Sequence, residues 1–207
     1  MDGIPFWLFG LIAIAAGYLL GSIPFGLVIA RLFGAGDIRQ IGSGNIGATN
    51  VLRTGRKGLA FTTLILDGLK GAVVVIALRV WTGDISIALM GGVAAVIGHN
   101  FPIWLQLKGG KGVATTIGVI IAAAPFVGIM TAATWAIVAA TFRISSLSAL
   151  VALGMAPIYA FILDRPTVLA FSFLAVLGWA RHAPNIGRLL KGQEPRIGAK
   201  SSSTQSN

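Results

Sequence analysis

Long apolar stretches alternate with short polar segments along this chain. Six stretches are apolar, of which five contain no charged residue and one is interrupted only by Asp67 and Lys70. The charge-free stretches are residues 3–30, 85–107, 112–142, 144–163 and 166–180, and the interrupted one is 58–78. About 20 apolar residues cross the hydrocarbon core of a bilayer as a helix, and charges are costly there. The pattern therefore predicts a bundle of membrane-spanning helices.

Residues 112–142 are too many for one upright span. As a single helix they would extend about 46 Å at 1.5 Å per residue. Pro125 lies near the middle of this stretch and removes a backbone hydrogen-bond donor. We therefore expect two short spans, 112–124 and 126–141, joined by a tight turn, which brings the total to seven.

The basic residues set the expected orientation of the seven spans. Seven spans leave Arg79 and Arg165 on one face and collect the other loop and tail basic residues on the opposite face. The excess of positive charge in cytoplasmic loops predicts an N-terminus outside and a C-terminus in the cytoplasm. The first stretch lacks the basic start of a signal peptide. The expected fold is an all-α integral membrane protein, one domain at 1–198, with a disordered polar tail at 199–207.

Composition supports a membrane protein and narrows the chemistry. Hydrophobic residues make up 56% of the 207 residues and charged residues 11%, against about a quarter charged in soluble domains. The mean hydropathy is +0.86. The net charge of +10 by itself fits nucleic acid, anionic lipid or an anionic substrate. The chain has no Cys, which excludes disulfides, thiolate catalysis and Cys-ligated metal centres.

A first polar segment, residues 34–58, is rich in glycine and small polar side chains. Its centre reads Gly-Ser-Gly-Asn-Ile-Gly-Ala-Thr-Asn-Val-Leu-Arg from Gly42 to Arg53. Repeated glycines let backbone N–H groups converge on an anion, and an arginine binds phosphate with two hydrogen bonds. Candidate binding residues are Gly42, Ser43, Gly44, Asn45, Thr49, Asn50 and Arg53. A flexible interfacial loop is the simpler alternative. The segment also matches the dinucleotide fingerprint as a bare string, but no buried strand precedes it, so that interpretation is rejected.

The second and third polar segments carry the remaining candidates. Residues 98–115 include His99 and the run Lys108-Gly109-Gly110-Lys111-Gly112, where a helix N-terminus and two lysines could bind phosphate. Lysines that only anchor a span end are the alternative. The third segment, 181–194, offers His182, Asn185, Arg188 and Glu194. Its alternative is an amphipathic helix on anionic lipid.

Two further features have open interpretations. His99 and His182 are the two histidines of the chain, and both stand beside basic or amide residues at span ends, which favours a proton or hydrogen-bond role. Asp67 and Lys70 lie three residues apart on one helix face. They are either an ion pair that neutralises itself inside the bundle or a pair that shapes the site.

Taken together, the three segments resemble the bacterial acyl-phosphate–glycerol-3-phosphate acyltransferase family. The matching motifs are the run from Gly42 to Arg53, Gly-His-x-Phe-Pro at 98–102 with Lys-Gly-Gly-Lys-Gly-Val-Ala-Thr at 108–115, and Arg-His-x-x-Asn-Ile-x-Arg-Leu-Leu-x-Gly-x-Glu at 181–194. The resemblance extends from Gly21 to Glu194. One departure is Ile46, where the family commonly has proline, and this concerns the rigidity of the loop.

The resemblance implies a seven-span enzyme of the bacterial inner membrane with its active site facing the cytoplasm. It would move a fatty acyl group from acyl phosphate to the first-position (sn-1) hydroxyl of glycerol 3-phosphate, giving lysophosphatidate and phosphate, the first acylation of phospholipid synthesis. The partners expected are the two substrates and the bilayer, without nucleic acid, cofactor, metal or acyl-CoA. The sequence leaves open the acyl-chain preference and the oligomeric state, for which a monomer would suffice.

Within this resemblance, the candidate catalytic residues are Ser43, Arg53, Lys111, His182 and Asn185. Arg53 and Lys111 would hold phosphate and neutralise the leaving group, Ser43 and Asn185 would orient the substrates, and loop amides could stabilise the oxyanion. Candidate phosphate-binding residues are Gly42, Gly44, Asn45, Thr49, Asn50, Lys108, Gly109, Gly110 and Arg188, supported by His99 and Glu194. The proton acceptor stays open among His182, His99 and a substrate phosphate oxygen.

Two other classes of function compete with the enzyme. A transporter of an anionic lipid precursor would typically show internal repeats and a site near the midplane, and neither is visible. A membrane scaffold would use the basic loops only for their charge, so it would tolerate exchange of arginine for lysine.

Overall fold

The computed structural model describes residues 5–198, and these form helices and turns without strands. The expected tail at 199–207 lies outside the described residues. The long helices are α1 (Phe6–Gly21), α4 (Lys57–Thr82), α5 (Ile85–Asn100), α6 (Val113–Ala123), α7 (Pro125–Phe142), α8 (Ser145–Leu163) and α9 (Val168–Arg181). Shorter elements are α2 (Phe25–Leu32), α3 (Ala48–Leu52), α10 (Ala183–Leu190) and the 3₁₀ turns Ile38–Gln40, Ile103–Leu105 and Arg165–Thr167.

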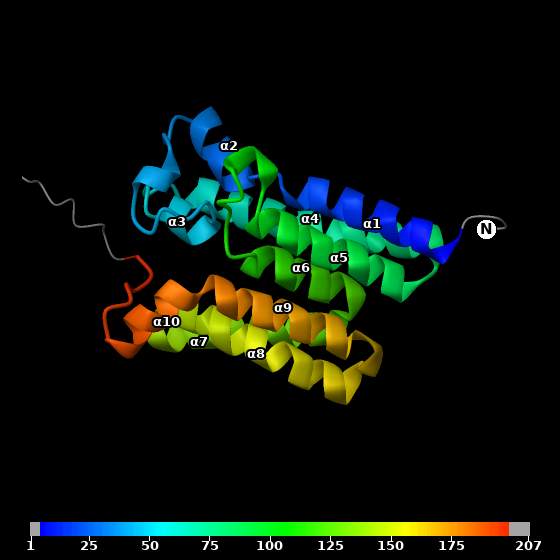
Figure 1. Ribbon diagram of the computed structural model, residues 1–207. Helices are drawn as coiled ribbons and strands as arrows, with labels where there is room; N and C mark the ends of the chain where they lie inside the picture. The colour runs from blue at the N-terminus through cyan, green and yellow to red at the C-terminus, as the bar shows by residue number, and fades with distance from the viewer. Residues whose placement is uncertain (1–4, 199–207) are drawn as a thin grey trace, which may run out of the picture.

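The long helices lie side by side in two groups (Figure 1). In one group α1 and α4 both pack on α5, and α4 also packs on α6. In the other group α8 packs between α7 and α9, and α6 and α7 join the two groups. Within residues 5–198, five helical segments are long and apolar enough to cross a membrane, namely Phe6–Leu32, Lys57–Thr82, Ile85–Leu105, Pro125–Phe142 and Ser145–Leu163.

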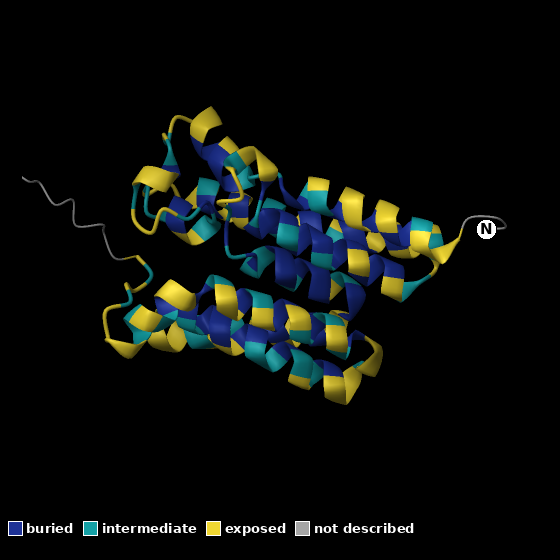
Figure 2. Ribbon diagram, in the orientation of Figure 1, coloured by how far each residue is buried: buried dark blue, intermediate teal, exposed yellow. Residues whose placement is uncertain are grey.

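Large apolar side chains cover the outward faces of the bundle. Figure 2 shows exposed positions along the outer sides of the long helices, with buried positions facing inward. Trp7, Phe126, Leu169 and Val176 are among the exposed apolar side chains. Apolar surface on this scale is unfavourable in water, so the burial pattern agrees with a chain whose outer face meets lipid.

Glycines bring neighbouring helices into close contact. A Cβ atom added at Gly17 in α1 would lie 2.1 Å from the carbonyl oxygen of Gly91 in α5. One added at Gly118 in α6 would lie 2.0 Å from the carbonyl oxygen of Gly68 in α4. Small residues let backbones approach in this way and strengthen packing where apolar burial gives no advantage over lipid.

The predicted break at Pro125 is confirmed. Helix α6 ends at Ala123, and α7 begins at Pro125 itself, where the missing N–H needs no partner. The first apolar stretch, 3–30, is interrupted by a break in the helix that the pattern did not predict: α1 ends at Gly21, and α2 begins at Phe25 after Pro24. Pro24 cannot donate to the preceding turn, and α2 instead packs on α3 and α4.

All three polar segments lie at the same end of the bundle (Figure 1). Residues 33–56 precede α4, residues 101–112 join α5 to α6, and residues 182–198 follow α9. The hairpin at Pro125 reverses the chain between the second and third segments, so this common position depends on it.

Candidate active site

The first polar segment is organised around the buried side chain of Asn50. Its Nδ2 donates to the carbonyl oxygen of Ile38 at 2.6 Å, and its Oδ1 accepts from the backbone N–H of Ser43 at 3.2 Å. The same Oδ1 lies 3.4 Å from the Ser43 hydroxyl and 3.3 Å from Nη1 of Arg53, both of which donate to it. One carboxamide therefore places Ser43 and Arg53 next to each other.

Gly42 allows this arrangement to close. Its φ is +56°, in the left-handed region that glycine adopts at little cost. A Cβ atom at this position would lie 2.5 Å from Nη1 of Arg53 and 2.6 Å from Oδ1 of Asn50. The sequence needs glycine here both for the turn and for the space that Arg53 occupies.

In the second segment, hydrogen bonds hold the two glycines from both sides. The backbone N–H of Gly109 donates to the carbonyl oxygen of Asn100 at 3.2 Å, and that of Gly110 donates to the carbonyl oxygen of His99 at 3.0 Å. Arg181, from the end of α9, donates to the carbonyl oxygens of Gly109 at 3.3 Å and Gly110 at 3.0 Å. The segment is thus fixed between α5 and α9. Lys111 comes next, separated from the start of α6 by Gly112.

In the third segment, Glu194 joins three side chains. It accepts hydrogen bonds from Asn185 at 2.5 Å, Arg188 at 2.7 Å and Ser146 at 2.8 Å. Burial opposes the ionisation of Glu194, but these hydrogen bonds outweigh it and hold its pKa below the usual value. Glu194 is therefore an anion at neutral pH, and it ties α10 to the start of α8.

His182 is buried and neutral at the junction of α9 and α10. Its Nδ1 lies 2.7 Å from the carbonyl oxygen of Gly178, which can only accept, so Nδ1 carries the proton and Nε2 keeps the free lone pair. Burial lowers the pKa of His182 to about 4, against the opposing effect of that hydrogen bond. The side chain can donate or accept hydrogen bonds, but it is a weak base.

Charged groups from the first and third segments act on Lys111 of the second segment. Burial, together with the positive charges of Arg188, Arg53 and Arg181, lowers the pKa of its ammonium group to about 8, against the opposing charge of Glu194. Among the described charged groups that act on Lys111, Glu194 is the one anion. Such an excess of positive charge around a half-buried lysine is suited to binding an anion.

The structure brings most of the predicted catalytic residues to this cluster. Ser43 and Arg53 share Asn50, Asn185 shares Glu194 with Arg188, and the charge of Lys111 acts on His182. Their roles in substrate binding stay predictions.

Several other predicted residues use their polar groups within the protein. The N–H groups of Ser43, Gly44, Gly109 and Gly110 all donate to protein oxygens. Thr49 lies 3.1 Å from the hydroxyl of Ser145, and His99 faces Lys70 beneath the second segment. Asn45 is half-buried, and its Oδ1 has no partner among residues 5–198. An anion would consequently meet side chains and the free N–H groups at the start of α6 more readily than these loop amides.

Sequence reasoning assigned no role to two residues that shape the site, Arg181 and Ser146, and it did not predict that Lys70 contacts His99. Arg181 holds the second segment, and Ser146 supports Glu194. Arg181 precedes His182 within the third motif, which was a usable signal. Ser146 and the Lys70 contact join distant parts of the chain, and no local pattern reveals them.

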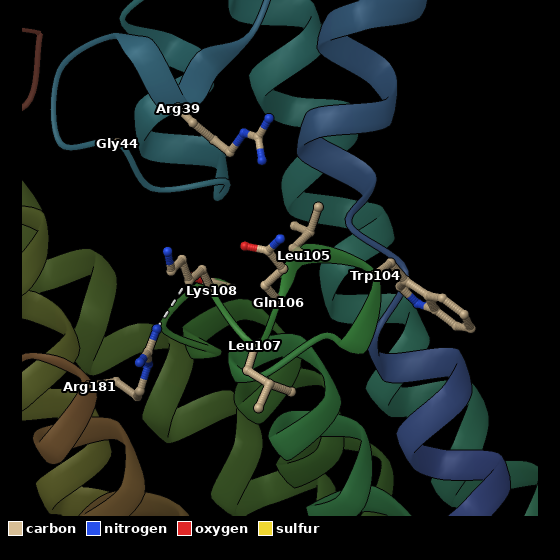
Figure 3. A pocket seen from close by; sticks show the side chains of 9 residues that line it. Arg39, Gly44, Trp104, Leu105, Gln106, Leu107, Lys108 and Arg181 are labelled. Atoms are coloured by element: carbon tan, nitrogen blue, oxygen red, sulfur yellow. Dashed lines mark hydrogen bonds between the residues drawn. The ribbon is translucent and has the colours of Figure 1, made fainter.

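A pocket of about 570 Å³ opens beside the cluster, on the side of Lys108 (Figure 3). Its lining combines the basic side chains of Arg39, Lys108 and Arg181 with apolar ones, including Trp104 and Leu107. Figure 3 shows Arg39 on one side of the opening and Lys108 and Arg181 on the other. The predicted catalytic residues do not line this pocket, so it adjoins the cluster instead of enclosing it.

Comparison with known proteins gives a consistent result. The family model described as glycerol-3-phosphate acyltransferase matches residues 11–192. The glycerol-3-phosphate acyltransferase of Rhodospirillum rubrum is 57% identical over 95% of this chain and 94% of its own. That of Paramagnetospirillum magneticum is 60% identical over 91% of this chain and 94% of its own.

Solved structures agree with the sequence comparisons. The crystal structure of PlsY (YgiH), described as an integral membrane glycerol 3-phosphate acyltransferase in its glycerol 3-phosphate form, superposes with a TM-score of 0.86 at 38% identity, covering 91% of this chain and 96% of that one. Its lysophosphatidic acid form gives a TM-score of 0.83 at 37% identity, covering 91% and 95%. With three motif segments converging on a cationic cluster and a family model that spans nearly the whole chain, this protein belongs to the glycerol-3-phosphate acyltransferase family.

Proposed function

We propose that this acyltransferase uses acyl phosphate as its donor and acylates the first-position hydroxyl of glycerol 3-phosphate, releasing lysophosphatidate and inorganic phosphate. The observation that carries the proposal is the cluster around Lys111, where the charges of Arg53, Arg181 and Arg188 act together on the lysine and, among the described groups that act on it, Glu194 is the one opposing charge. Both substrates and both products bear phosphate, so a site with this charge can bind each of them. The solved relative described in a glycerol 3-phosphate form supports the acceptor.

Different residues bind the phosphate groups and orient the acceptor. Arg53 and Lys111 bind phosphate oxygens and neutralise the charge that develops on the departing phosphate. The N–H groups at the start of α6 lie next to Lys111 and favour an anion there. Ser43 is exposed and, with Asn185, orients the acceptor, while Arg188 and Glu194 hold Asn185 in place.

The reaction is a single displacement. The acceptor hydroxyl oxygen attacks the acyl carbonyl carbon, the bond from that carbon to the phosphate oxygen breaks, and the hydroxyl proton must leave. His182 has a free Nε2, but with a pKa of about 4 it is a weaker base than a phosphate dianion. We therefore assign the proton to a substrate phosphate oxygen, and His182 to hydrogen bonding.

The proposed enzyme works without metal and without acyl-CoA. The two carboxylates of the motif segments are already engaged with arginines, Asp37 with Arg31 and Arg39, and Glu194 with Arg188. Hydrogen bonds from Arg39 hold the pKa of Asp37 well below its usual range. Hard cations such as Mg²⁺ need free oxygen ligands, so this donor set suits an anion better.

The proposed topology has seven spans, with the motif segments on the cytoplasmic side of the bacterial inner membrane. The common position of the three segments supports a single site on one side (Figure 1). Arg53, Lys108 and Lys111 at that end agree with the excess of positive charge in cytoplasmic loops.

A donor comparison tests the proposal. Purified protein is supplied with glycerol 3-phosphate and, separately, palmitoyl phosphate, palmitoyl-CoA or palmitoyl-acyl carrier protein, each with and without EDTA. Of the three donors, we expect only palmitoyl phosphate to give lysophosphatidate, with an equal amount of phosphate. EDTA should leave this rate unchanged. Turnover that requires acyl-CoA or a metal, or acyl label bound to Ser43 after quenching with donor alone, would contradict the mechanism.

A further inference from the structure

A buried polar cluster lies beneath the second segment, made of Asp67 and Lys70 from α4 and His99 from α5. The side chains are 3%, 1% and 5% exposed. Nζ of Lys70 lies 2.9 Å from Oδ1 of Asp67, 3.0 Å from the carbonyl oxygen of Ile23 and 2.7 Å from Nδ1 of His99. An ion pair that only neutralised itself would need the first of these contacts and not the third.

The hydrogen-bond donors and acceptors fix the tautomer of His99. An ammonium group has three N–H donors and no acceptor, and Lys70 has three acceptors around it. Nδ1 of His99 must then accept, which places the ring proton on Nε2. The alternative, in which Nδ1–H donates to Asp67, is disfavoured because that separation is 3.6 Å. Lys70 thus decides both the tautomer and the direction in which the ring faces.

The ring of His99 lies against the second segment. A Cβ atom added at Gly110 would lie 2.0 Å from Nε2, so the ring edge packs directly on the glycine backbone. The carbonyl oxygen of His99 accepts a hydrogen bond from the Gly110 N–H, and Arg181 donates to the carbonyl oxygen of Gly110. Rotation of the ring would therefore disturb the residue that precedes Lys111.

We infer that Asp67, Lys70 and His99 are positioning residues for the glycerol 3-phosphate site. Asp67 holds Lys70, Lys70 holds the His99 ring, and the ring supports the Gly109–Gly110 backbone so that Lys111 meets the phosphate. None of the three touches substrate. The inference rests on the proposed role of Lys111 in phosphate binding.

A charge-neutral double variant separates positioning from simple charge pairing. Asp67→Asn/Lys70→Met removes both charges at once and so leaves no unpaired ion in the bundle. If the pair only neutralises itself, this variant should keep wild-type kinetics. We expect instead that KM for glycerol 3-phosphate rises by about tenfold or more, by analogy with the loss of a partner that orients a metal-binding histidine. The value of kcat should fall by a smaller factor.

The matched control is Arg79→Met, which removes a cation from the same helix. Arg79 is exposed, and its guanidinium reaches the carbonyl oxygen of Ala123 at the end of the bundle away from the motif segments. The control should keep wild-type KM and kcat. A double variant with kinetics equal to both wild type and Arg79→Met would overturn the positioning role.

A spectroscopic measurement on the unaltered protein tests the geometry without any assay of activity. The chain has two histidines, so ¹⁵N-histidine labelling gives two ring systems, and a His99→Asn variant assigns them. At neutral pH we expect His99 with Nδ1 unprotonated and Nε2 protonated, and loss of this tautomer preference in the double variant. A protonated Nδ1 in the wild type would overturn the inference even if the variants failed to fold. If palmitoyl phosphate is not a donor, the proposed function fails while this measurement still decides the contact between Lys70 and His99.

Discussion

At the scale of single residues, the geometry of charged groups matters more than their number. Arg53 donates to Asn50 and lies beside Ser43, so its guanidinium has a fixed direction. Lys111 is a cation whose pKa is depressed by burial and by neighbouring arginines. The direction of Arg53 can be tested by a substitution that keeps its charge and alters its shape. The pKa of Lys111 can be tested by varying the pH.

Arg53→Lys should remove most of the activity while the protein still inserts and folds. Lysine keeps the charge but loses the planar group that binds phosphate with two hydrogen bonds, and we expect a fall in kcat/KM of about 100-fold. The control is Arg31→Lys, an exposed arginine paired with Asp37. Near-normal activity of Arg53→Lys in the acyl phosphate assay would rule out the assigned role.

The affinity for glycerol 3-phosphate should weaken as the pH passes about 8, the pKa of Lys111 in the free protein. The pKa is lowered from its usual value, so the ammonium is fully charged below this pH and loses its proton above it. The substrate phosphate stays a dianion over that range. KM measured between neutral and alkaline pH should therefore rise in the wild type and stay flatter in Lys111→Arg. Identical pH profiles for both proteins would contradict the role of Lys111.

At the scale of elements, the first segment is a preformed structure and not an open loop. The 3₁₀ turn Ile38–Gln40 and helix α3 frame it, and the Asn50 carboxamide links the two parts. Gly42 faces the side chains that this link brings together. A larger side chain at Gly42 should consequently disturb this element and lower activity. A larger side chain at a glycine elsewhere in the same segment should not.

Gly42→Ala and Gly55→Ala form a matched pair for this idea. Both glycines have a positive φ, +56° and +81°, so alanine strains the backbone at either position, by about 1 kcal/mol. A Cβ atom at Gly42 would collide with Arg53, whereas one at Gly55 meets nothing within 4 Å. We expect Gly42→Ala to lose activity by about tenfold or more, because Arg53 must move from its phosphate-binding position, and Gly55→Ala to stay near wild type. Equal kinetics of the two variants would show that strain alone matters.

At the scale of the whole molecule, the hairpin at Pro125 decides whether one site exists. It returns the chain so that α9 ends beside the second segment, where Arg181 reaches Gly109 and Gly110. Helices α1 and α5, held together by the close contact at Gly17 and Gly91, position the other side. The site therefore requires both groups of helices.

Single-cysteine labelling can test this topology, since the chain has no native cysteine. Cysteines introduced at the exposed positions Gln40 and Gln193 should react with an impermeant reagent from the same side of the membrane. A cysteine at Ser86, exposed at the start of α5, should react from the opposite side. If Gln40 and Gln193 label from different sides, the seven-span topology and the shared site are both wrong.

The sequence by itself determined the membrane class, the division of residues 112–142 at Pro125 and the three motif segments. These follow from local patterns: charge-free length, a proline that removes a donor, and clusters of glycine with basic residues. Family membership is also contained in the motifs, because their order and spacing are specific even where each motif alone is not.

Only the tertiary structure decided how the motif residues are used. It placed Nδ1 of His99 against Lys70, engaged the Gly109 and Gly110 amides within the protein, and brought Ser146 to Glu194. The contacts of Lys70 with His99 and of Ser146 with Glu194 join groups from distant parts of the chain. A hydrogen bond between distant segments depends on how the helices pack against one another, and no local pattern of residues carries that information.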